Sequence, residues 1–150
     1  MTINDRFTQG LLAGILGGIP SLAWGLFSQY ILKFSSHLYG DFAAALIYGK
    51  NAANIWDKLF NQLVVFMFFG LGGIIFAFLV RRISSRNLVL KGMFWAGMIW
   101  FFSYAVTRLY KVAGLVTFPL PTAVSHLIGA LIWGVAMALI YNYLNQKTLI

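Results

Sequence analysis

Four long apolar stretches restrict what this 150-residue chain can fold into. They cover about residues 10–32, 56–80, 90–110 and 122–144, and each supplies the roughly 20 residues that a helix needs to cross a bilayer core. Only helices and closed barrels satisfy the backbone inside lipid, and these stretches are too long and too uniform for barrel strands. The sequence therefore predicts an all-α polytopic membrane protein, a single transmembrane domain over residues 1–150, with four helices arranged as two hairpins.

The composition excludes a soluble fold and several kinds of chemistry. Hydrophobic residues make up 61% of the chain and charged residues 9%, against about 45–50% and about 25% in an average soluble domain. So few charges cannot cover the surface of a soluble enzyme of this length. Because the chain has no cysteine, thiol catalysis and cysteine-bound metals are excluded as well.

The basic residues indicate what the protein surface meets and how the chain is oriented. The net charge is +8, but the cations stand between apolar stretches, which favours anionic lipid headgroups over nucleic acid. The short connection between the second and third stretches is the most basic part of the chain. By the positive-inside rule we expect this connection, and with it both termini, in the cytoplasm. Its cations, which we expect to contact anionic headgroups, are Arg81, Arg82, Arg86 and Lys91.

The first connection is the longest, and part of it has the pattern of a short helix. Asp41 is a candidate N-cap, the following residues are apolar, and Gly49 with Lys50 provides a stop. The segment is too short to span a membrane. We expect it to lie in the interface between water and lipid, or to dip into the membrane, between the first and second transmembrane helices.

Small residues recur at a spacing of four along the predicted helices. This spacing lets helix backbones approach closely in lipid, either within the bundle or between subunits of a homo-oligomer. The first helix carries small residues on two faces, so that one face is expected to be left for another subunit. The candidate packing residues are Gly10, Gly14, Gly17, Gly18, Gly73, Gly129 and Gly134.

Polar residues gather near the outer ends of the predicted helices. One hypothesis is a pocket open to the outside, in which Arg108 and His126 bind an anionic or polar ligand and Asp41 or Asp57 pairs with Arg108. The alternative is that Arg108 extends to the interface and the other groups hydrogen-bond neighbouring helices. The remaining candidate ligand-binding residues are Gln29, Asn61 and Gln62.

The same residues give little support to catalysis. His37 and His126 lack metal-ligand spacing, and Ser103 and Ser125 lack the context of an activated nucleophile, so we expect no metal, no cofactor and no enzymatic activity. No acid lies at mid-membrane, which disfavours proton-coupled transport. The leading hypothesis is a non-enzymatic membrane protein that associates with itself or with another membrane protein. The alternative is a small channel or transporter with an outward-facing polar pocket.

The chain resembles a known group of proteins in its general pattern. The pattern comprises a glycine-rich first helix, the segment from Asp41 to Lys50, Lys91-Gly92 with Ala96-Gly97, and residues 131–134 with the sequence Leu-Ile-Trp-Gly. It is similar to the small four-helix membrane proteins of Gram-positive bacteria grouped as YqhR-like. The resemblance implies a bacterial plasma membrane and assigns no activity, cofactor or site residue.

Overall fold

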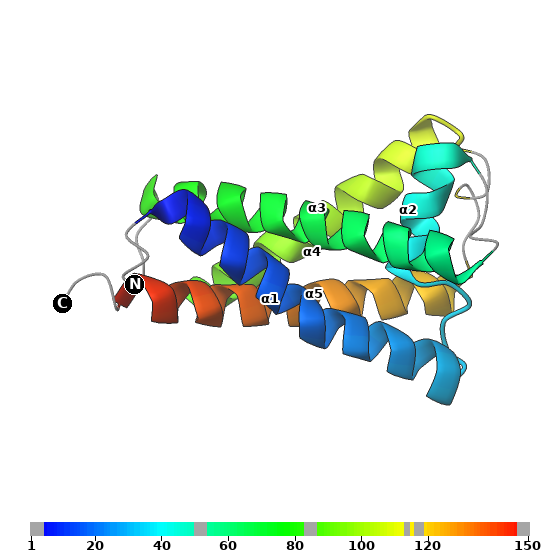
Figure 1. Ribbon diagram of the computed structural model, residues 1–150, viewed down its shortest axis with the longest axis horizontal. Coiled ribbons are helices and arrows are strands. Elements are labelled where there is room, and N and C mark those ends of the chain that lie inside the picture. Colours follow the sequence, from blue (N-terminus) through cyan, green and yellow to red (C-terminus); the bar gives the residue numbers. More distant parts are fainter. Residues whose placement is uncertain (1–4, 50–53, 83–86, 113–114, 116–118, 147–150) are drawn as a thin grey trace.

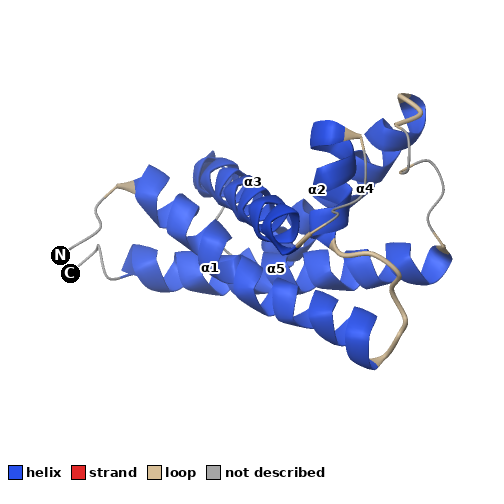
Figure 2. Ribbon diagram, turned by 45° about the vertical axis from the view of Figure 1, so that its right-hand side comes forward, coloured by secondary structure: helices blue, strands red, loops and turns tan. Residues whose placement is uncertain are grey.

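The computed structural model describes residues 5–49, 54–82, 87–112, 115 and 119–146, and every regular element among them is a helix (Figures 1 and 2). Four helical segments are long and apolar enough to cross a membrane, which confirms the all-α polytopic class. The elements are α1 (Arg6–Leu26) with its π-helical continuation η1 (Phe27–Ile31), α2 (Tyr39–Tyr48), α3 (Ile55–Arg82), α4 (Leu88–Leu109) and α5 (Leu120–Gln146).

Side chains next to the helix ends decide where several of these helices begin. Asp5 accepts hydrogen bonds from the amides of Phe7 and Thr8, so α1 starts at Arg6, earlier than the apolar stretch indicated. The side chain of Asn54 likewise accepts from the amide of Asp57, in the first turn of α3.

The expected short helix is present as α2, but its start differs from the expectation. Asp41 is not the N-cap; it lies inside the first turn, and its carboxylate accepts a hydrogen bond from the amide of Leu38, 2.9 Å away. Gly49 ends the helix with a φ of 70°, a left-handed conformation that costs glycine little. Ala44 and its neighbours are buried, because α2 packs against α3 and lies between α3 and the C-terminal end of α4.

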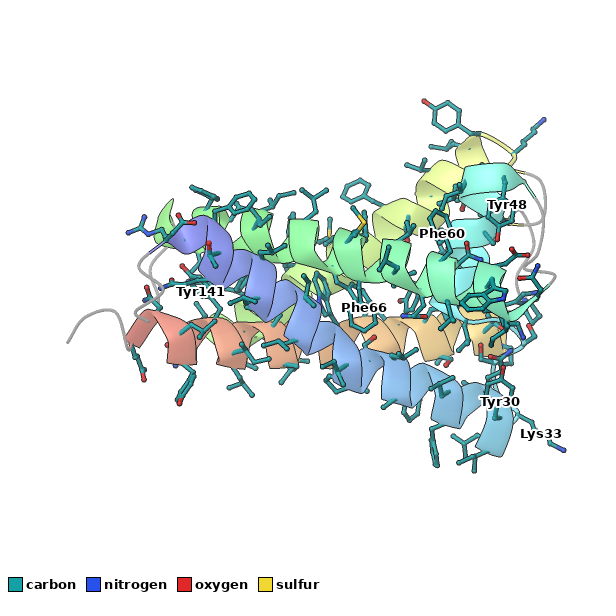
Figure 3. The ribbon with its side chains drawn as sticks, viewed as in Figure 1. Tyr30, Lys33, Tyr48, Phe60, Phe66 and Tyr141 are labelled. Carbon is teal, nitrogen blue, oxygen red and sulfur yellow. The ribbon has the colours of Figure 1, made fainter. Side chains whose placement is uncertain are left out.

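The spanning helices form two antiparallel pairs, and the two pairs pack on each other through one helix of each. α1 packs against α3, α4 packs against α5, and α1 also packs along α5, whereas α3 and α4 scarcely touch. The chain ends of the described part lie at the same end of the bundle as the last turn of α3 and the first turn of α4 (Figure 1). Phe66 lies in the middle of the bundle, and Tyr141 lies close to the end that carries the termini (Figure 3).

Close backbone contact between α1 and α3 depends on glycine. A Cβ atom on Gly10 would lie 2.7 Å from the carbonyl oxygen of Gly73, and one on Gly14 would overlap the carbonyl of Phe69. Gly18 faces the Phe69 ring in the same interface, where a Cβ atom would lie 2.5 Å from a ring carbon. These glycines therefore pack within the chain.

The second small-residue face of α1 is also filled. A Cβ atom on Gly17 would lie 2.9 Å from the amide nitrogen of Met137 in α5. Gly129 of α5 lies opposite Ser21 of α1, at an ordinary van der Waals distance. Both faces are occupied by helices of the same chain, which corrects the expectation that one face remains for another subunit.

The α4–α5 pair uses the same principle. A Cβ atom on Gly92 would overlap the carbonyl of Gly134, and one on Gly134 would overlap the carbonyl of Gly92. Ala96 and Ala138 flank the crossing and are fully buried. Small residues thus fix the α4–α5 pair as they fix the α1–α3 pair.

Tryptophan side chains add hydrogen bonds between the helices. An indole N–H that is buried in lipid or protein needs an acceptor, and backbone carbonyls of neighbouring helices supply it here. The four bonds run from Trp24 to Ser125 (3.0 Å), from Trp133 to Gly14 (2.9 Å), from Trp100 to Ala123 (3.2 Å) and from Trp95 to Gly72 (3.1 Å).

Two glycines of α4 provide a matched test of this packing. Gly92→Ala must displace a backbone carbonyl of α5, and we expect a loss of stability of about 1–3 kcal/mol, as for overpacked cores. A Cβ atom on Gly97 meets nothing within 4 Å, so Gly97→Ala gains helix propensity and should leave stability unchanged or raise it by up to about 1 kcal/mol. Thermal melting of both variants in one detergent compares them, and equal melting temperatures would contradict the assigned α4–α5 contact.

Candidate functional site

His126, one of the polar residues predicted at the outer helix ends, is buried in α5. Its Nε2 lies 3.0 Å from the backbone carbonyl of His37, and its Nδ1 lies 2.8 Å from the hydroxyl of Tyr104. Because a carbonyl only accepts, Nε2 carries the proton, and in the neutral ring Nδ1 accepts from the phenol. The ring also stacks on Tyr39, with centroids 4.4 Å apart. Both ring nitrogens are therefore satisfied inside the protein.

Tyr39 closes this cluster from α2. Its hydroxyl donates to the backbone carbonyl of His126, which ties α2 to α5. Burial raises the pKa of the Tyr39 phenol, so this group remains a protonated donor across the physiological range.

The other polar groups at this end also join helices to one another. Asn61 of α3 and Tyr48 of α2 are hydrogen-bonded, with the amide nitrogen 2.7 Å from the phenol oxygen. Gln29 of η1 donates to the carbonyl of Ser36, at 3.3 Å. Two hydroxyl pairs complete the set, Ser28 with Ser125 at 2.7 Å and Ser36 with Thr122 at 3.0 Å.

The predicted ligand pocket stays a prediction, and the structure places several of its residues in other contacts. Arg108 is exposed in the last turn of α4, four residues after Tyr104. Asp41 is bound to the start of α2, and Asp57 lies in the first turn of α3. Gln62 borders a cavity of about 20 Å³, which has room for about one water molecule.

A much larger cavity than this one lies elsewhere, as a groove along the side of the bundle between α3 and α4. Its volume is about 1110 Å³. α3 and α4 form its walls, α2 lines one end, and Trp133 and Ala130 of α5 contribute to its floor. The walls are built mainly of bulky apolar side chains, among them Phe68 and Phe76 of α3 and Phe94, Trp95 and Met98 of α4.

The groove was not foreseen in the sequence, although a signal for it exists. The short connection favours direct packing of α3 on α4, but each helix uses its small residues against another partner. Gly73 faces α1, Gly72 faces the ring of Trp133, and Gly92 faces α5. The sides of α3 and α4 that remain are bulky and cannot close on one another.

These features define a class of protein. It is a helical membrane protein with a polar cluster at one end and an apolar groove along one side. No protein-family model, curated protein or solved structure matches the chain. Among the described residues, no three His, Cys, Asp or Glu side chains form a group that could hold a metal ion.

The role of the polar cluster can be tested at Tyr104. Tyr104→Phe removes the donor to Nδ1 of His126 and leaves a buried acceptor unpaired, so we expect a loss of about 1–3 kcal/mol of stability. Tyr110→Phe removes a hydroxyl from a side chain that is 79% exposed and should change stability by less than about 0.5 kcal/mol. Thermal unfolding in detergent measures the stability of both variants. Equal stability of the two would refute the hydrogen bond between Tyr104 of α4 and His126 of α5.

Proposed function

We propose that this protein is a non-enzymatic protein of the bacterial plasma membrane that binds acyl chains of a membrane lipid in the groove between α3 and α4. The observation that carries the proposal is the groove itself, an apolar channel open along the side of a membrane-spanning bundle. Its lining on α3 extends from Val64 to Val80, about 24 Å at 1.5 Å per residue, close to the thickness of the hydrocarbon core.

The size of the groove is compatible with lipid chains. Its volume is about 1110 Å³. This is close to the upper end of small-ligand sites, which run to roughly 1,000 Å³.

The bulky side chains of the groove walls favour lipid chains over a transmembrane helix. Helices that associate in lipid do so through small residues that allow close approach. The groove instead presents large aromatic and aliphatic side chains, such as Phe68, Phe94 and Met98. A flexible chain can follow such a surface, whereas a rigid helix would be held away from it.

This proposal modifies the hypothesis that the protein associates with itself or with another membrane protein. The small-residue faces that the hypothesis used are filled within the chain, so a second copy or another membrane protein would have to use a different surface. The groove is one such surface, and a helix seated there is the competing outcome of the experiment below. The channel or transporter alternative has less support, because the groups around His126 bond one another.

Photo-crosslinking identifies the occupant. A phospholipid with a diazirine on its acyl chain, incorporated into nanodiscs with the purified protein, should label groove residues such as Phe94 and Phe68. Met98→Trp adds volume to the groove wall and should reduce this labelling several-fold. Met67→Trp makes the same change on a side chain of α3 that is 65% exposed and does not line the groove, and should have no effect.

Two results would overturn the lipid proposal. One is equal labelling of the groove in the two tryptophan variants, since ordinary bilayer lipid would then explain the adducts. The other is the absence of groove adducts together with a mass of two chains per nanodisc complex, which would place a second copy there.

The proposed orientation has its own test. We propose that the end with both termini and the α3–α4 connection faces the cytoplasm. The chain has no cysteine, so Ser84→Cys in that connection and Lys111→Cys beyond α4 report the two sides separately. A membrane-impermeant maleimide should label position 111 on intact cells and position 84 only after permeabilisation; the reverse result would invert the topology.

A further inference from the structure

We infer that the lipid in the groove is an anionic phospholipid whose headgroup lies beside Lys91, at the start of α4. The inference rests on the proposed function and adds the chemical class of the lipid and its direction in the groove. It is carried by the distribution of charge along the groove walls.

The charge in the groove lining is found at one end of the groove. Among the described residues that line it, Lys91 alone carries a formal charge. Lys91 lies in the first turn of α4, half-buried, at the end of the groove where Val80 and Leu90 also lie. The hydrocarbon stem of a lysine can line apolar surface while its ammonium group reaches the headgroup region.

The opposite end of the groove is lined mainly by apolar side chains of α2 and α4. α2 supplies Phe42, Leu46 and Ile47 there, and α4 supplies Val106 with the buried Thr107. The ring of Phe42 contacts Tyr104, with centroids 5.7 Å apart, so α2 is anchored to α4 across this end. A lipid whose headgroup lies at Lys91 would direct its chains towards α2.

The backbone at the start of α4 strengthens the attraction for an anion. The first amides of a helix have no intrahelical acceptor and carry the positive end of the helix dipole. Asn87 precedes α4 in a left-handed conformation, and its side chain makes no capping hydrogen bond. The helix dipole thus adds to the positive potential that Lys91 creates at this end of the groove. The sequence places three more cations just before the start of α4, namely Arg81, Arg82 and Arg86.

An anionic headgroup gains more from this environment than a zwitterionic one. The cation of a zwitterionic headgroup would be repelled by the same positive potential that attracts its phosphate. One lysine near a membrane surface contributes an attraction that corresponds to about a fivefold change in binding. On the proposed orientation the headgroup belongs to the cytoplasmic leaflet, where anionic lipids gather.

Competition between two lipids tests the inference. Phosphatidylglycerol and phosphatidylcholine with identical diazirine-bearing chains are compared at equal mole fraction in nanodiscs, with adducts at Phe94 as the readout. We expect phosphatidylglycerol to label the wild-type groove several-fold more strongly. Lys91→Gln should lower that ratio about fivefold, while Lys91→Arg retains it.

Lys58→Gln is the matched control. Lys58 is an exposed lysine in the first turn of α3, at the end of the bundle remote from Lys91, so its removal should leave the ratio unchanged. A ratio that survives Lys91→Gln, or that falls equally in Lys58→Gln, would overturn the headgroup assignment. If Lys91→Gln does not fold, salt replaces it as the test. A tenfold rise in salt should shrink the wild-type ratio towards one, and an unchanged ratio counts against the inference.

The two proposals fail in different ways. If the groove is labelled by both lipids without preference, chain binding stands and the anionic headgroup does not. If neither lipid labels the groove and Met98→Trp changes nothing, the proposed function itself is wrong.

Discussion

Close contact between backbones at glycine is the constraint on which the rest of this bundle depends. In lipid, helices gain nothing by hiding apolar surface from one another, so packing must come from van der Waals contact at short range. α1 supplies that contact on two sides, through Gly10 and Gly14 towards α3 and through Gly17 towards α5. Gly92 and Gly134 repeat it between α4 and α5. Because these contacts determine which helices pack closely, they also determine that α3 and α4 touch at only a few points.

The polar groups act at one end of this framework. His126, Tyr39 and Tyr104 join α5, α2 and α4, while Asn61 with Tyr48 joins α3 to α2. Each bond satisfies a group that would be costly to leave unpaired inside a membrane protein. The cluster thus anchors α2 where it closes one end of the groove.

Much of the fold could be predicted from the sequence, and much of the site could not. Four spans and the short helix before Gly49 follow from hydropathy and local chemistry, which depend on a few neighbouring residues. The spacing of Gly10, Gly14 and Gly17 also showed that close packing would occur, but not which helix each face would meet. The groove depends on that choice of partners, and so does the meeting of Tyr39, Tyr104 and His126 from three helices. Neither property belongs to any single segment.

The order of contacts, α3 to α1 to α5 to α4, describes an open ring rather than a closed one. In a closed four-helix bundle every helix has two neighbours, and a change at one interface is resisted by the others. Here α3 and α4 have no packed interface along their length. The hydrogen bond from Trp95 to the carbonyl of Gly72 joins them at one point, and α2 lies between them at one end. The membrane-facing side of the molecule is therefore held by these two connections alone among the described residues.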